Sequence, residues 1–233
     1  MKAMILAAGR GQRMRPLTDH TPKPLLPVGG KPLIVWHIEK LVAAGIPDIV
    51  INTAWLGEKL QSALGDGASY GARLVWSAED PPLETAGGIA RALPALGPEP
   101  FLVVNGDVWC DWDFRAALSC AEALVQCEAL AWLLLVDNPA HNPQGDFLLA
   151  PQGHIFHVPE LAPAKSVSLT FSGIGVYDPR LFVGVSGDDP APLAPVLRHA
   201  MQHNAVIGSQ HQGMWWDIGT PERLQQLDTQ LTM

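Results

Sequence analysis

The chain has 233 residues, with 15 Lys and Arg against 23 Asp and Glu, which gives a formal net charge of −8. The first 31 residues hold six basic side chains and one acidic one, so this segment carries +5 and the rest of the chain carries −13. This distribution argues against general nucleic-acid binding, which needs a broad basic surface, and favours one anion site near the N-terminus.

Hydrophobic residues make up 48% of the chain and charged residues 16%, which is typical of a globular protein. The longest clearly apolar run, Ala129–Val136, has eight residues, far fewer than the roughly 20 that span a bilayer. We therefore expect no membrane segment. Three cysteines without a C-x-x-C pair favour reduced thiols and a cytoplasmic location over a disulfide or a zinc site: Cys110, Cys120 and Cys127.

In the first half, apolar runs alternate with amphipathic segments. The runs predict buried strands at Met4–Ala8, Ile49–Ile51, Leu74–Trp76 and Phe101–Val104. The amphipathic segments predict helices at Leu33–Ala44, Gly57–Leu64 and Gly87–Leu96. This β-α-β-α order predicts an α/β fold with a doubly wound, mostly parallel sheet, in which ligands bind at the carboxyl ends of the strands.

The second half is less regular. A helix at Asp113–Cys127 and a strand at Leu130–Val136 precede three further β segments, Phe147–Leu149, Ile155–Val158 and Leu169–Tyr177. Two more helices are expected near Pro192–His203 and Pro221–Leu231. Because no linker separates the halves, we expect one domain over residues 1–233, whose second half extends the sheet and makes it mixed.

A glycine-containing loop follows the first predicted strand. Gly9 and Gly11 allow backbone N–H groups to approach phosphate oxygens closely. A Rossmann G-x-G-x-x-G would need glycine at Met14, and a Walker loop ending at Lys31 would need glycine at Leu25. Both patterns fail. Farther along, Lys23 lies between two prolines that restrict the backbone on either side.

Residues 6–28 read L-A-A-G-x-G-x-R-M-x-P-L-T-x-x-x-P-K-P-L-L-P-V, which closely resembles the signature of the sugar-1-phosphate nucleotidyltransferases. The resemblance implies a Rossmann-like nucleotidyltransferase architecture that takes a nucleoside triphosphate and a sugar 1-phosphate. It also implies catalytic roles for Arg13 and Lys23 at the reacting phosphates. The nucleotide-binding residues that it implies are Ala8, Gly9, Gly11, Gln12, Arg13, Lys23 and Gly88.

Two aspartates are candidate ligands for Mg²⁺, which prefers hard oxygen donors. Asp107 follows a predicted strand through Asn105-Gly106, and Asp217 lies in W-W-D-I-G-T just before a predicted helix. Taken alone, each aspartate fits a turn or a structural role. The V-N-G-D and W-x-D-x-G-T contexts resemble the family's metal sites, which implies that Asp107 and Asp217 form the Mg²⁺ pair.

The remaining segments concern the base and the sugar. The stretch P-L-E-T-A-G-G resembles the family's P-L-G-T-A-G segment beside the nucleobase, but Glu84 stands where glycine is usual. The resemblance implies sugar-binding roles for Asn105, Gly145, Asp146 and Gly173, although Asp146 also fits a residue that caps a turn.

Over essentially the whole chain, the resemblance is strongest to family members that join UTP to N-acetylmuramate 1-phosphate in peptidoglycan recycling. The alternatives within the family are a mannose-1-phosphate guanylyltransferase and a glucose-1-phosphate thymidylyl- or uridylyltransferase. A non-catalytic sugar-nucleotide sensor is the alternative from another class.

The mechanism that the resemblance implies needs no nucleophilic side chain. An oxygen of the sugar phosphate, largely ionised because its second pKa is about 6, attacks the α-phosphorus, and pyrophosphate leaves. We expect Mg²⁺ as the cofactor and a monomer or a small homo-oligomer that binds neither nucleic acid nor membrane.

Overall fold

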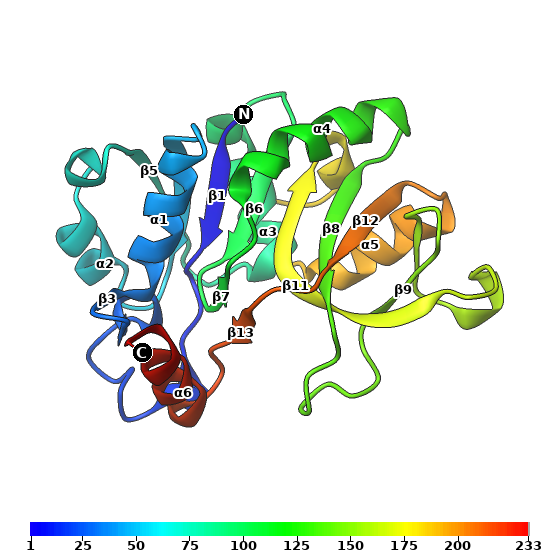
Figure 1. Cartoon of the computed structure of the whole chain (residues 1–233). Coiled ribbons are helices and arrows are strands. Elements are labelled where there is room, and N and C mark those ends of the chain that lie inside the picture. The colour runs from blue at the N-terminus through cyan, green and yellow to red at the C-terminus, as the bar shows by residue number, and fades with distance from the viewer. Residues whose placement is uncertain (233) are drawn as a thin grey trace.

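Within residues 1–232, which the computed structural model describes, a nine-stranded sheet runs through the molecule (Figure 1). Four of its strands are parallel and lie in the order β5-β4-β1-β6. Their bounds are β1 (Ala3–Leu6), β4 (Asp48–Thr53), β5 (Arg73–Ala78) and β6 (Phe101–Asn105). The carboxyl ends of β1, β4 and β6 therefore meet at one edge of the sheet.

The sheet continues beyond β6 with mostly antiparallel neighbours. The long strand β11 (Val167–Tyr177) runs antiparallel to β6 and to β8 (Ala131–Val136). An edge strand, β12 (Val206–His211), lies parallel to β8. The register of β11 against β8 shifts between Phe171 and Gly175, and β11 curves away there in Figure 1. Its first residues pair with β9 (Phe147–Leu149), which in turn pairs with β10 (Ile155–Phe156).

Helices cover both faces of the sheet, as a doubly wound fold requires (Figure 1). One apolar core packs the sheet against α1 (Leu33–Ala43), α2 (Gly57–Leu64) and α4 (Ala117–Gln126). The core on the opposite face packs it against α3 (Glu84–Leu96) and α5 (Leu193–Gln202). Neighbouring residues of β1 alternate between these cores, since Met4 belongs to one and Ile5 to the other.

A third, smaller core joins the loop that follows β1 to the C-terminal helix. It lies between the N-terminal loop and α6 (Pro221–Thr232), and the backbone N–H of Gly29 donates to Oδ1 of Asp228 at 2.8 Å. Two short ladders adjoin it: β2 (Pro27–Val28) with β3 (Lys31–Pro32), and β7 (Val108–Cys110) with β13 (Trp215–Asp217). Its buried members are Met14, Leu26, Val28, Leu33, Trp109, Ile218, Leu224 and Leu227.

Short 3₁₀ turns connect several of these elements. They span Gln12–Met14, Lys23–Leu25, Ala68–Tyr70, Phe114–Ala116, Pro159–Leu161 and Pro179–Phe182. No helix of residues 1–232 combines the length and apolarity that a membrane crossing requires.

The predicted α/β fold with a mixed sheet is confirmed, with the parallel pairs concentrated in the first half. The predicted second and third helices are present, but α3 begins at Glu84, three residues before the predicted Gly87. The segment predicted as one helix at Asp113–Cys127 is a 3₁₀ turn followed by α4. Strands β2, β3, β7, β12 and β13 were not predicted.

Candidate active site

A cleft opens at the carboxyl ends of the parallel strands and has two adjoining cavities. The first cavity has a volume of about 380 Å³, and its lining includes Ala8, Gly9, Lys23 and Asp107. The second cavity has a volume of about 470 Å³ and extends toward β9, β11 and α5. Both cavities are lined by Glu84, Thr85 and Asn105, so they meet along these three residues.

The N-terminal loop places its two glycines in different surroundings. Gly11 has a φ of 61°, and a Cβ atom there would lie 2.9 Å from Cγ2 of Thr18, so a larger residue does not fit. The Thr18 hydroxyl donates to the Gly11 carbonyl at 2.7 Å and fixes this turn. Gly9 has no atom within 4 Å of a Cβ position and lines the first cavity. The backbone at Gly9 is therefore open to a ligand.

The predicted residues that follow the glycines lie outside the lining of the first cavity. Gln12 and Arg13 are exposed on the 3₁₀ turn, which is anchored by the buried Met14. Nη1 of Arg13 would lie 3.3 Å from a Cβ atom at Gly219. The Arg13 guanidinium thus extends toward the segment that carries Asp217.

Lys23 and Asp107 form an ion pair in the first cavity. Nζ of Lys23 donates to Oδ2 of Asp107 at 2.7 Å. The lysine begins a 3₁₀ turn after the extended Pro22 and is buried, whereas Asp107 is partly exposed. A phosphate group would compete for the lysine and a cation for the aspartate, so this pair can receive both.

Asp217 is brought beside Asp107 by the ladder of β7 and β13. Asp217 lies opposite Val108 in this ladder, and the N–H of Ile218 donates to the Asp107 carbonyl at 2.9 Å. The two predicted metal ligands therefore lie on neighbouring backbone segments, although more than a hundred residues separate them in the chain.

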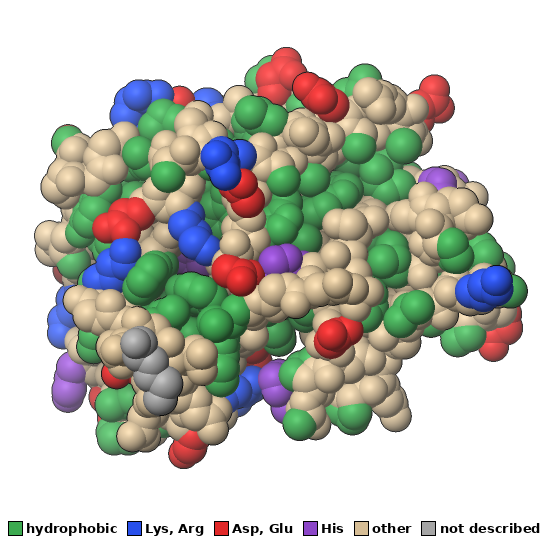
Figure 2. Space-filling model, viewed as in Figure 1, with side chains coloured by type: hydrophobic (Ala, Val, Ile, Leu, Met, Phe, Trp, Pro, Cys, Tyr) green, Lys and Arg blue, Asp and Glu red, His purple; other side chains and the backbone are tan. Residues whose placement is uncertain are grey.

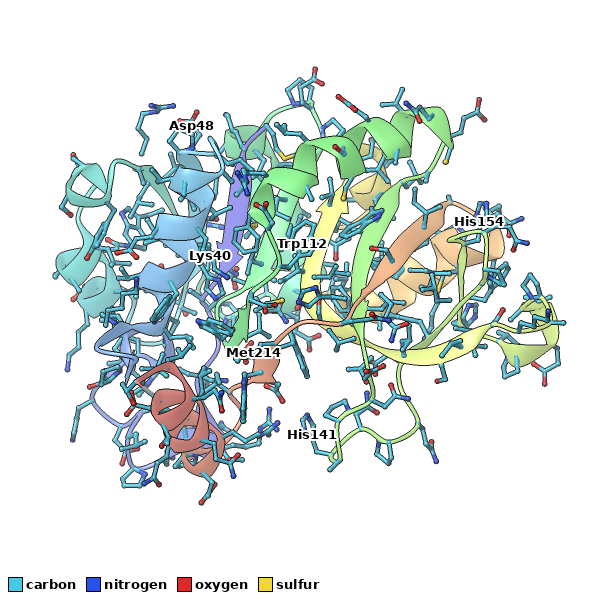
Figure 3. All side chains as sticks on the ribbon, viewed as in Figure 1. Lys40, Asp48, Trp112, His141, His154 and Met214 are labelled. Carbon is cyan, nitrogen blue, oxygen red and sulfur yellow. The ribbon has the colours of Figure 1, made fainter. Side chains whose placement is uncertain are left out.

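Two side-chain partners of Asp217 were missed by the sequence reasoning. Nη1 of Arg223 donates to Oδ2 of Asp217 at 2.6 Å, and Nε2 of His141 lies 3.2 Å from the same oxygen. Figure 3 shows His141 on the loop between β8 and β9, which faces the region of α6. In Figure 2 the molecular surface is indented between these two regions. The position of Arg223 in the first turn of α6 was a usable signal, whereas nothing in the sequence around His141 indicated this contact.

The base of the first cavity is held by a buried polar network that the sequence reasoning also missed. Oδ1 of Asn52 accepts from the N–H of Ala7 at 2.7 Å, and its Nδ2 donates to Oε1 of Glu79 at 2.7 Å. Oε2 of Glu79 accepts from the N–H of Leu83 at 2.8 Å. This network ties the ends of β1 and β4 to the segment before α3.

Gly88 lies behind this network, outside the lining of the first cavity. A Cβ atom there would lie 2.5 Å from Oε1 of Glu79 and 3.0 Å from Nδ2 of Asn52. Glycine is needed at this position because α3 approaches the network closely.

In the second cavity, the Asp146 carboxylate links the loop after β8 to β11. Its Oδ1 accepts from Nδ2 of Asn142 at 3.0 Å, and its Oδ2 accepts from the N–H of Phe171 at 2.8 Å. Gly145 has a φ of 70°, which suits glycine at this turn. The bonds of Asp146 tie the loop to the strand, and Gly145 and Asp146 both line the cavity.

The other two predicted sugar-site residues contact each other. Asn105 lines both cavities, and a Cβ atom at Gly173 would lie 2.7 Å from its Nδ2. Gly173 has a φ of 81° at the register shift of β11. Gly173 therefore allows Asn105 to reach the cleft.

A separate group of possible metal ligands lies at the other end of the β7–β13 ladder. Ligand atoms of Cys110, Asp111 and His211 all lie within 4.8 Å of one another. Burial raises the pKa of the Cys110 thiol to about 11, which keeps it protonated near neutral pH. Nζ of Lys40 donates to the carbonyl of Cys110 and places a positive charge beside the group. These features favour Asp107 and Asp217 as the metal site.

Comparisons with known proteins agree with the geometry. The family model described as "Nucleotidyl transferase" matches residues 2–233. An N-acetylmuramate alpha-1-phosphate uridylyltransferase from Neisseria meningitidis is 56% identical over 227 residues, which cover 97% of this chain and 96% of the relative.

More distant relatives carry other names. The mannose-1-phosphate guanylyltransferase catalytic subunit beta of Drosophila melanogaster is 30% identical over 95% of this chain and 60% of its own length. A Bacillus anthracis structure solved with sucrose, described as a candidate glucose-1-phosphate thymidylyltransferase, has a TM-score of 0.83 and 26% identity, and the match covers 100% of this chain and 95% of that one. With a family match along nearly all of its length, the chain belongs to the nucleotidyl transferase family and is similar to its sugar-1-phosphate enzymes.

Proposed function

We propose that this chain transfers the uridylyl group of UTP to N-acetylmuramate α-1-phosphate and releases pyrophosphate, as a step in peptidoglycan recycling. The chemistry is supported above all by the cleft itself, in which two cavities adjoin and the first contains the Lys23–Asp107 pair. The choice of substrates is supported by the 56% identity to the Neisseria meningitidis enzyme over nearly both chains.

The first cavity suits the triphosphate and the second suits the sugar. Backbone N–H groups at Ala8 and Gly9 are available to phosphate oxygens, as in other glycine loops. We therefore assign nucleotide binding to the N-terminal half and sugar binding to the C-terminal half of one domain that spans residues 1–233. UTP is a cytoplasmic metabolite, so we infer a cytoplasmic location.

In the reaction, an oxygen of the sugar phosphate attacks the α-phosphorus of UTP. A new P–O bond forms while the bond to the bridging oxygen breaks, and that oxygen leaves with pyrophosphate. Lys23 and Arg13 offset the negative charge that develops at the α-phosphate and on the leaving group. No general base is required because the attacking phosphate is already ionised near neutral pH.

We also infer that Asp107 and Asp217 hold Mg²⁺. The donor set fits, because two partly exposed carboxylates lie on adjacent backbone segments and each is paired with a side chain of opposite charge. When bound, Mg²⁺ would supply positive charge to the phosphate oxygens. Arg223, which donates to Oδ2 of Asp217, and His141, which lies against the same oxygen, orient this carboxylate.

Arg198 supports the choice of sugar. It is the one cationic side chain that lines the second cavity, and within residues 1–232 it forms no ion pair. N-acetylmuramate carries a carboxylate on its lactyl ether, whereas mannose and glucose carry none. A guanidinium binds a carboxylate through two parallel hydrogen bonds, so Arg198 would favour the acidic sugar.

A substrate matrix tests this function. Pyrophosphate release is measured for five nucleoside triphosphates against the 1-phosphates of N-acetylmuramate, N-acetylglucosamine, glucose and mannose. We expect the highest kcat/KM with UTP and N-acetylmuramate 1-phosphate. A maximum with GTP and mannose 1-phosphate would instead establish the guanylyltransferase alternative, and tight binding of a sugar nucleotide without turnover would establish a sensor.

The proposed Mg²⁺ requirement is tested in the same assay. Chelation by EDTA should abolish turnover, and added Mg²⁺ should restore it. Asp107→Asn should lose the Mg²⁺-dependent activity while its circular dichroism spectrum stays unchanged, because the amide keeps the shape but removes the charge. Full activity of this folded variant would remove Asp107 from the metal site.

A further inference from the structure

Glu84 adopts a backbone conformation that favours glycine. Its φ is 58°, in the left-handed region, at the first residue of α3. A side chain in this region crowds its own carbonyl group, which makes the conformation unfavourable for residues other than glycine. The structure thus explains why glycine is usual at this position in the family, and it shows that this chain keeps a strained residue there.

The strain is located in the cleft. Within residues 1–232, four other residues besides the glycines have a positive φ: Leu56, Glu128, Lys165 and Asn204. None of them lines the first or the second cavity, whereas Glu84 lines both. Strained residues that persist in a binding site often do so because their side chains are used there.

The carboxylate of Glu84 is free, unlike those of the other acidic residues that line the cleft. Glu79 is bonded to Asn52 and to the N–H of Leu83, and Asp107 is paired with Lys23. Asp146 is bonded to Asn142 and to the N–H of Phe171. Within residues 1–232, the exposed Glu84 side chain forms no hydrogen bond or ion pair, so its oxygens remain available to a ligand.

We propose that Glu84 accepts hydrogen bonds from the hydroxyl or amide N–H groups of the sugar ring and thereby determines which sugar 1-phosphate is used. This proposal rests on the proposed function, which puts a sugar 1-phosphate in the second cavity. The phosphate groups of both substrates are poor partners for Glu84, because their negative charges repel a carboxylate. The sugar ring instead offers neutral donors, and a hydrogen bond to an ionised acceptor is stronger than one between neutral groups.

A purely structural role for Glu84 makes different predictions. An acidic side chain in the first turn of a helix is stabilised by the helix dipole, and Glu58 occupies such a position in α2. If Glu84 served only α3, its replacement would change the stability of the protein but not the KM of either substrate. Glu58 is exposed and lies outside both cavities, so Glu58→Gln is a matched control.

Two replacements of Glu84 separate charge from strain. Glu84→Gln keeps the side-chain size and the backbone strain but removes the charge. Glu84→Gly removes the carboxylate and relieves the strain, so it should raise the Tm by roughly 2–4 °C. A loss of activity in this more stable variant could not result from unfolding.

The experiment measures the KM of each substrate in turn, with the other substrate saturating. For both variants we expect the KM of N-acetylmuramate 1-phosphate to rise roughly 10- to 100-fold, the effect of losing a charged hydrogen bond. The KM of UTP should stay within about twofold, and Glu58→Gln should match the wild type in both values. An unchanged KM for the sugar phosphate, or a rise in the KM of UTP alone, would overturn the assignment.

Calorimetric binding of N-acetylmuramate 1-phosphate separates this proposal from the proposed function. If the wild type binds this compound but does not turn it over, the proposed activity is wrong, and weaker binding by the Glu84 variants still supports the role of Glu84. Equal binding by wild type and variants refutes that role. If the wild type neither binds nor turns over this sugar phosphate, both proposals fail.

Discussion

The two sides of the cleft hold their polar groups in different ways. Beside the parallel strands, Asn52 and Glu79 are buried and bond to the backbone at the ends of β1 and β4. Beside β11, polar side chains of the β8–β9 loop and of β11 bond mainly to each other and to nearby backbone. These side chains are Asn138, Asn142, Asp146 and Thr170.

This difference suggests how one fold accommodates different sugars. The Asn52–Glu79 network, on the side proposed to bind the nucleotide (the nucleotide side), is part of the sheet and cannot change without disturbing the core. The network beside β11, on the side proposed to bind the sugar, belongs mostly to the loop between β8 and β9. A different loop sequence could replace this network without changing the sheet. In the proposed function, the first arrangement would hold the nucleoside triphosphate and the second would hold the sugar, which differs between family members.

The largest effect on activity should come from removing Lys23, on the nucleotide side of the cleft. Lys23→Ala should lower kcat on the order of 10²–10³-fold, because it removes one preorganised positive charge from the reacting phosphates. The measurement is pyrophosphate release at saturating substrates. Lys31→Ala is the control, since Lys31 pairs with Glu39 and lines neither cavity. Near wild-type turnover in Lys23→Ala would remove this lysine from the mechanism.

An intermediate effect should appear in the pH dependence of the unfolding free energy, through the buried His37 of α1. Burial lowers the pKa of His37 in α1 from 6.5 to about 4, and its Nε2 has no hydrogen-bond partner within residues 1–232. The unfolded chain therefore takes up this proton at a higher pH than the folded protein does. The contribution of the neutral His37 to the unfolding free energy is therefore present above about pH 6.5 and is lost as the pH falls toward 4. The unfolding free energy should decrease by about 2 kcal/mol between about pH 7 and pH 5.

Urea unfolding of His37→Phe tests this effect. The phenyl ring preserves the stacking on Phe114 and cannot be protonated, so the decrease in unfolding free energy at low pH should be smaller by about that amount. His199→Phe, at an exposed position in α5, should keep the wild-type pH dependence. Equal pH dependence in the His37 variant and the wild type would contradict the prediction.

The smallest effects on stability should come from two glycines near the first cavity, Gly88 and Gly9. Gly88→Ala should destabilise the protein by a net of about 1–2 kcal/mol, because overpacking against Glu79 outweighs the higher helix propensity of alanine. Gly9→Ala meets no atom within 4 Å, so it should change stability by less than about 0.5 kcal/mol but raise the KM of UTP. Urea unfolding and kinetics together check both variants; the opposite pattern would show that Gly9, not Gly88, supports the fold.

The parallel half of the fold was predictable because each of its strands is a short apolar run between amphipathic helices. Strands β7, β12 and β13 were not predictable in this way. In β12 only Val206 and Ile207 are strongly apolar, and pairing with β8 rather than local sequence makes this segment a strand. The early start of α3 was missed because a positive φ at Glu84 is uncommon for its residue type.

The candidate site was predictable only where its residues lie in recognisable local motifs. Lys23 and Asp107 belong to such motifs, and the structure brings them into contact. Arg223 lies six residues after Asp217, so local reasoning could have found its contact. His141 reaches Asp217 only because distant segments pack together, and no local pattern indicated this contact. The bond of Asp146 to the N–H of Phe171 also joins segments that spacing along the chain does not bring together.

The small core that joins the N-terminal loop to α6 has a consequence for synthesis on the ribosome. Met14 and Val28 leave the exit tunnel early, but Leu224 and Leu227, which cover them, are translated last among the described elements. A nascent chain therefore exposes its N-terminal loop before α6 is made to cover it, and before Asp217 is made. Partly made chains should neither bind UTP firmly nor consume it, so turnover begins only after translation has passed α6.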